Sequence, residues 1–186
     1  AVNPKIDRTQ LADDTEVSFV PMAAVGAADG SIDASTVRPY AEVKKGYTHF
    51  RENDVLFAKV TPCMENGKMA VVPALVNGFG FGSTEFHVLR PMQNIDAKYL
   101  YYYVSSQGFR SEAERHMTGA VGQRRVPTAY LKECRIPVAP LDQQKRIVAE
   151  IEKQFSRLDE AVANLQRVKA NLKRYKASVL KDAVEG

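Results

Sequence analysis

The most regular pattern in the sequence is a seven-residue spacing of apolar positions near the C-terminal end. The stretch 142–184 contains neither proline nor glycine. One apolar row recurs every seven residues, and a second begins four residues after the first and shifts where Lys169 interrupts it. This spacing is typical of a coiled-coil seam. It predicts one long helix, N-capped by Asp142, whose packing face consists of Ile151, Phe155, Leu158, Val162, Leu165, Val168, Leu172, Tyr175 and Val179.

A helix of this kind needs a partner. Roughly 40 residues of helix extend about 60 Å at 1.5 Å per residue, and a single rod cannot bury its own apolar stripe. No second heptad run occurs in the sequence. We therefore expect the helix to pack against another copy of the chain or against another protein.

The chain before this helix carries shorter patterns, with strands first and helices later. Apolar runs predict strands at 17–20, 55–60, 69–72 and 85–89, with a hairpin turn at Asn66-Gly67. Residues 26–40 are expected to form a loop, and 77–82 are rich in glycine. Helices are predicted after an Asp96 cap, at 109–117 and at 128–134, and an edge strand at 135–138. Because regular strand–helix alternation is missing, we expect an α+β fold, with a globular domain at 1–140 and the helix at 141–186.

Composition and charge add two limits. No apolar run approaches the length of a membrane span and no signal-peptide pattern begins at Ala1, so a cytoplasmic protein is expected. The net charge of +4 is concentrated in the helix, because residues 1–140 are nearly neutral. Six basic residues and no acid lie between Ala161 and Lys181. These residues form either a solvated helix face or a docking surface for phosphates or an acidic partner.

The sequence offers little support for an enzyme. It has no Gly-Lys-Ser/Thr phosphate loop and no Gly-x-Ser-x-Gly elbow. The histidines His49, His87 and His116 lack neighbours at metal-ligand spacing, and we expect no metal site in this chain. Asp33 with Glu42-Val43-Lys44 is a weak match to a magnesium-dependent nuclease.

Five segments resemble, in the family's order, the specificity (S) subunit of type I restriction-modification systems. They are DVLFAKVTPCMENGKMAVV, GFGSTEFHVLRP, YLYYYV, MTGAVGQRRVP and RIPVAPLDQQKRIVAEIE. The family usually has Pro-Pro-Leu-x-Glu-Gln before its conserved helix. Here the sequence is Ala-Pro-Leu-Asp-Gln-Gln, with Gln143 in place of the glutamate.

The resemblance implies a non-catalytic DNA-recognition subunit. Family members normally carry two target-recognition domains, each followed by a helix, and the two helices pack antiparallel as a ruler. This chain has one of each, which implies a half subunit, either a natural half or a fragment, that reads one half of a bipartite target. It would pair as a homodimer or with a second half subunit. Methyltransferase (M) and restriction (R) subunits would supply the chemistry with S-adenosylmethionine, ATP and Mg²⁺, and this chain would bind no cofactor.

Residue chemistry suggests which side chains contact DNA. Arginine pairs with guanine and glutamine with adenine in the major groove, and Gln123, Arg124 and Arg125 lie together on a glycine-bracketed loop. Phosphate contact or internal ion pairing is an equal alternative for them. Further candidates, for phosphate contact, are Lys59, Thr61, Lys68, Ser83 and Thr84, for which ordinary surface or turn roles are the alternative. A different function, a non-DNA adaptor that oligomerises through its helix, also fits the sequence.

Overall fold

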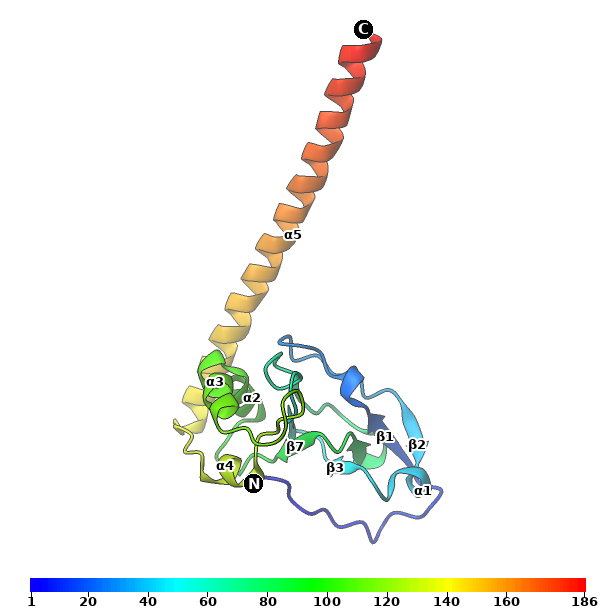
Figure 1. Cartoon of the computed structure of the whole chain (residues 1–186), viewed down its shortest axis with the longest axis vertical. Helices are drawn as coiled ribbons and strands as arrows, with labels where there is room; N and C mark the ends of the chain where they lie inside the picture. The colour runs from blue at the N-terminus through cyan, green and yellow to red at the C-terminus, as the bar shows by residue number, and fades with distance from the viewer. The chain divides into compact units, whose positions relative to one another are not determined.

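The computed structural model describes residues 1–186, whose contacts divide the chain into two compact units (Figure 1). The first, Ala1–Lys145, is called the head below; the second is Arg146–Gly186. The head combines two small sheets with short helices, which confirms the expected α+β class.

The head contains a four-stranded and a three-stranded sheet. The first has the order β2-β1-β6-β3, formed by Val37–Pro39, Glu16–Val20, Gly80–Gly82 and Thr48–Phe50. The second has the order β5-β4-β7, formed by Met69–Val71, Val55–Ala58 and Phe86–Leu89. All pairs are antiparallel except β1 with β6. The strands predicted at 17–20, 55–60, 69–72 and 85–89 are thus confirmed, with slightly different ends.

The glycine-rich segment forms a strand that its sequence pattern does not predict. Strand β6 lies between β1 and β3. A Cβ atom on Gly80 would lie 2.1 Å from Cε2 of Phe50, and one on Gly82 would lie 2.2 Å from the carbonyl oxygen of Val20. Only glycine allows this close approach. The single side chain between them, Phe81, is fully buried.

Three other expectations about the head were wrong in part or in full. The predicted loop 26–40 ends in β2, which is followed directly by helix α1 (Tyr40–Val43). The turn at Asn66-Gly67 belongs to a ten-residue connection between β4 and β5 rather than a tight hairpin, because turns already begin at Thr61. Residues 135–138 form no strand. The apolar residues and the Asn66-Gly67 turn correctly indicated a chain reversal between β4 and β5. They did not determine the length of that connection.

Two helices of the head begin at side-chain caps, of which the Asp96 cap was predicted. The carboxylate of Asp96 accepts from the amide of Tyr99 at the start of α2 (Ala97–Ser105), and the hydroxyl of Ser106 accepts from the amide of Phe109 at the start of α3 (Gln107–Arg115). Helix α4 is Thr128–Glu133, and the short 3₁₀ helices η1 and η2 are Met22–Ala24 and Val76–Gly78. The bounds of α2, α3 and α4 agree with the predicted helices to within a few residues, whereas η1 and η2 were not predicted.

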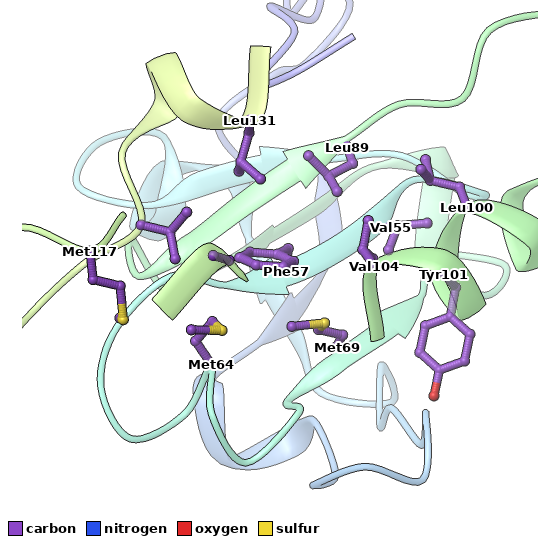
Figure 2. Close-up of a cluster of buried hydrophobic side chains, with 12 residues drawn as sticks. Val55, Phe57, Met64, Met69, Leu89, Leu100, Tyr101, Val104, Met117 and Leu131 are labelled. Carbon is purple, nitrogen blue, oxygen red and sulfur yellow. The ribbon is translucent and has the colours of Figure 1, made fainter. Parts of the chain in front are cut away.

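Strand β4 lies at the centre of the head's core. Val55 and Phe57 pack against α2, α3 and α4 through residues such as Leu100 and Leu131, and Figure 2 shows Phe57 among these side chains. The alternate residues Leu56 and Ala58 pack into a second cluster that contains residues of the other sheet. Because both faces of β4 are covered, its sequence is a continuous apolar run rather than an alternating one.

Helix α5 spans Leu141–Glu185, close to the predicted range, but Asp142 lies within its first turn and is not the N-cap that was predicted. Its side chains from Phe155 onward are exposed. Large apolar residues of the predicted packing face are among them, including Leu165 at 68% and Leu172 at 61% exposure. Ile151 is partly buried. None of the helices has the length and apolar character that a membrane span needs.

The first turn of α5 belongs to the head and is fastened by Gln144. This side chain is fully buried. Its Oε1 accepts from the amide of Asp96 at 2.9 Å, and its Nε2 donates to the carbonyls of Asn94 at 2.8 Å and Ala139 at 2.7 Å. The amide of Gln144 thus makes three hydrogen bonds, all to backbone groups of the segments that precede α2 and α5.

Candidate nucleic-acid interface

The loop 118–125 is held at its base by backbone hydrogen bonds. Thr118 and Arg125 exchange both amide–carbonyl bonds, at 3.0 and 2.8 Å. Gly119 and Gly122 adopt positive φ angles within the loop, and Val121 is fully exposed. These two glycines, which both precede Gln123, thus allow a tight, exposed loop whose ends are fixed.

The same segment pairs with the chain that leaves β4. The amide of Thr61 donates to the carbonyl of Arg124 at 3.0 Å, and the amide of Val126 donates to the carbonyl of Lys59 at 2.9 Å. Lys59 and Thr61, two of the predicted phosphate contacts, therefore lie beside the predicted base-reading loop although the segments are about 60 residues apart in sequence.

Strand β7 brings the third segment to this place. Ala58 of β4 is the register partner of Phe86 of β7, and the amide of Lys59 donates to the carbonyl of Glu85 at 2.9 Å. The Lys59 Nζ donates to the carbonyl of Thr84 at 2.7 Å, and the Ser83 hydroxyl accepts from the amide of Glu85. We call the assembled set the loop cluster; it consists of Lys59, Thr61, Ser83, Thr84, Gln123, Arg124 and Arg125.

Both loop arginines already have acidic partners. Arg125 donates through Nε and Nη2 to the two carboxylate oxygens of Glu85, each at 2.9 Å, and through Nη1 to the carbonyl of Gln123. This hydrogen bonding lowers the pKa of Glu85 and raises that of Arg125. Arg124 Nη2 lies 3.4 Å from Glu114 and 4.0 Å from Glu65. The internal ion pairing considered for these residues is therefore present, while both side chains keep more than a third of their surface exposed.

The remaining candidates have local partners. The Thr61 hydroxyl donates to Glu65 at 2.7 Å. Lys68 Nζ donates to the carbonyls of Met22 and Val25 at 3.3 and 3.0 Å, in a partly buried position. Lys68 thus fastens the segment after β1 and does not join the loop cluster by any of these bonds. Thr84 and Gln123 are exposed.

A hollow of about 300 Å³ adjoins the loop cluster at Lys59 and Thr84. Its wall includes Arg8 and His49, which are joined by a 2.9 Å hydrogen bond. Burial, followed by the nearby Arg8 charge, lowers the pKa of His49. Arg8 comes from the polar N-terminal segment, where sequence analysis offered no reason to single it out.

The residues of the weak nuclease match have structural partners. Asp33 accepts from the amide of Ser35, and Lys44 pairs with Asp13 at 2.9 Å. Among residues 1–186, no three His, Cys, Asp or Glu side chains gather into a set that could hold a metal ion. Asp33 and Lys44 of the weak nuclease match thus have partners other than each other.

The comparison with known families decides the assignment. The family model for the type I restriction modification DNA specificity domain matches residues 2–174. The chain belongs to this family. The resemblance noted in the five sequence segments is thereby confirmed.

Two curated relatives agree with this assignment, and a solved structure has the same fold. The chain is 42% and 40% identical to the specificity subunits of the Escherichia coli type I restriction enzymes EcoAI and EcoEI, over 86% of its length. It spans about a quarter (27%) of each relative's length. The HsdS subunit of Thermoanaerobacter tengcongensis shares the fold, with a TM-score of 0.65 at 22% identity, over 80% of this chain and 38% of that one.

A second solved structure has the same fold. It comes from work described as the structural basis of complex assembly and conformational transition of the type I R-M system. It gives a TM-score of 0.66 at 22% identity, over 87% of this specificity-family chain and 40% of the other. At this identity the likeness supports the fold alone.

Proposed function

We propose that the head reads one half of a bipartite double-stranded DNA target for a type I restriction-modification enzyme. The observation that carries this proposal is the loop cluster: a chain of the DNA specificity family brings glutamine, two arginines and a lysine to one exposed place. Arginine and glutamine supply the paired hydrogen bonds that distinguish bases in the major groove. Lysine and hydroxyl groups suit the phosphates, which position a protein without specifying sequence.

The chemistry is assigned to other subunits. In this proposal the chain is non-catalytic and positions M and R subunits, which use S-adenosylmethionine, ATP and Mg²⁺. The alternative is an adaptor that does not read DNA. It predicts no preference for any duplex, whereas the proposed function predicts one short preferred motif.

Alanine substitutions in the loop test the proposal. The full chain, with and without an M subunit, is first used to select a preferred motif from a pool of randomised duplexes. Arg124→Ala or Arg125→Ala is then expected to weaken binding to that motif roughly 5- to 150-fold if the residue pairs with guanine. Fluorescence anisotropy titration measures this change.

The matched control is Arg115→Ala, which removes the same charge from an exposed position on α3, where Arg115 pairs with Glu112. It should leave the preference for the motif unchanged. If neither loop variant differs from the wild type, the loop takes no part in base reading. If the wild type selects no motif even with an M subunit, the adaptor interpretation is favoured.

We also propose that α5 pairs with a second long helix, either in a homodimer or from another half subunit. The exposed heptad stripe supports this, because such a stripe is normally covered in a coiled coil. In solution the paired helix would fix the distance between two recognition heads, and so between the two halves of the DNA target.

Charge placed on the stripe should abolish self-pairing. The double variant Leu165→Glu, Leu172→Glu is expected to sediment as a monomer at concentrations where the wild type is a dimer, because it places two carboxylates in the seam. The control, Ala163→Glu with Ala170→Glu, adds the same charge at the same spacing on the opposite face of the helix. A monomeric wild type at micromolar concentration would contradict the homodimer.

A further inference from the structure

Glu85 is not a member of the loop cluster, but it contacts three of its residues, Lys59, Ser83 and Arg125. It directly precedes β7, and its carbonyl accepts from the Lys59 amide while its own amide donates to the Ser83 hydroxyl. Its backbone is thus fixed on both sides. A carboxylate beside a DNA-contacting surface would repel phosphates, so its presence there calls for a compensating role.

The contact with Arg125 suggests that role. A guanidinium group has five N–H donors in a rigid planar fork. Glu85 takes one on Nε and one on Nη2, and the carbonyl of Gln123 takes one on Nη1. Two donors remain, one on each terminal nitrogen. A guanine presents two acceptors, O6 and N7, and is recognised by two such donors.

The Arg125 side chain is held yet accessible. Its relative exposure is 43%, and that of Glu85 is 30%. The Arg125 backbone is fixed as well, by its two bonds to Thr118. An arginine fixed at its backbone, at one edge of its fork and at the loop carbonyl loses less rotamer freedom on binding than a free one.

We propose that Glu85 is a specificity-determining positioning residue, which holds Arg125 so that its two remaining donors face a guanine of the target. This inference rests on the proposed function and adds a residue to it. Glu85 acts through Arg125 and need not touch the DNA. Its removal has two consequences of opposite sign: the loss of a negative charge strengthens binding to any duplex, and the loss of positioning weakens discrimination at one base pair.

The test is Glu85→Gln in the full chain, with the motif selected by the wild type from randomised duplexes as the probe. We expect discrimination at one G·C pair to fall by about one order of magnitude, while affinity for a scrambled duplex is unchanged or higher. Arg125→Ala should lose discrimination at the same pair. The double variant should discriminate at that base pair as well as Arg125→Ala alone does, because both changes remove the same interaction.

The matched control is Glu112→Gln on α3. Glu112 pairs with Arg115 and His116, and its replacement removes the same charge without touching Arg125. It should keep the full discrimination. Thermal unfolding midpoints of all variants identify any loss of fold, and Glu85→Asp, which keeps the carboxylate, should retain more discrimination than Glu85→Gln.

The other outcomes separate this inference from the proposed function. If Arg125→Ala loses discrimination and Glu85→Gln keeps it, positioning by Glu85 is overturned and DNA reading by the loop stands. If Glu85→Gln binds the motif more tightly with discrimination unchanged, Glu85 is an inhibitory partner and the inference is again overturned. If the wild type selects no motif with an M subunit present, the proposed function and the inference both fail.

Discussion

Replacing Arg90 by alanine is expected to lower the free energy of unfolding of the head by about 3 kcal/mol. The Asp54 side chain is 1% exposed, and Arg90 donates to its two carboxylate oxygens at 2.7 Å each. Without Arg90 the buried carboxylate keeps only the amide of Arg51 as a donor among these bonds. We expect the lower end of the usual range because Arg90 is 28% exposed, so water partly replaces it.

Urea unfolding measures this effect, and the chain contains a matched control. Lys44 and Asp13 form an ion pair at 2.9 Å with exposures of 37% and 68%. Lys44→Ala should therefore cost no more than about 1 kcal/mol. Adding Asp54→Asn to Arg90→Ala should recover part of the loss, since it removes the unpaired charge. Equal effects of Arg90→Ala and Lys44→Ala would contradict a buried, coupled pair.

This ion pair and the loop cluster lie at opposite ends of the same two strands. Asp54 precedes β4 and Arg90 follows β7, whereas Lys59 follows β4 and Glu85 precedes β7. The antiparallel register Val55–Leu89 to Ala58–Phe86 joins the two ends. The paired strands β4 and β7 thus hold Lys59 and Glu85 beside each other at one end and Asp54 and Arg90 at the other.

Local sequence patterns correctly predicted those helices that are determined by residues close together in the sequence. The heptad rows predicted α5, and the Asp96 cap predicted the start of α2, because each depends on residues a few positions apart. Strand β6 was not predicted because its glycines are required by Phe50 and by the backbone of Val20, which are distant in sequence. Glycine is needed in β6 because of contacts with other strands of the same chain, and a local sequence pattern does not contain that information.

The candidate site could be predicted only in part, because some of its residues are recognised by type and others only by their tertiary contacts. Residue type identified the loop arginines, and the structure brings Lys59 and Thr61 to them. Lys59 and Lys68 look equivalent in sequence, one on each side of the connection between β4 and β5. Only the tertiary structure distinguishes them: the Lys59 ammonium donates to the carbonyl of Thr84 in the loop cluster, whereas that of Lys68 donates to the carbonyls of Met22 and Val25. Glu85 was missed because its partner is 40 residues away.

Gln144 is a second residue whose replacement is expected to lower the free energy of unfolding strongly. It ends the Pro-Leu-x-x-Gln pattern that runs from Pro140 into the first turn of α5, and its buried amide satisfies one backbone N–H and two carbonyls of the head. Gln144→Ala leaves these three groups without a partner. Each such group costs roughly 1–3 kcal/mol, and water relieves part of that.

We therefore expect Gln144→Ala to lower the free energy of unfolding by about 3 kcal/mol in urea titrations. Amide hydrogen exchange at Asp96 should accelerate, because that N–H loses its acceptor. Gln144→Glu should be at least as harmful, since it keeps the shape but sets a carboxylate against two carbonyls. Gln143→Ala, an exposed change one residue earlier, should stay within about 0.5 kcal/mol. Similar effects at Gln143 and Gln144 would show that the buried amide does not fasten the first turn of α5.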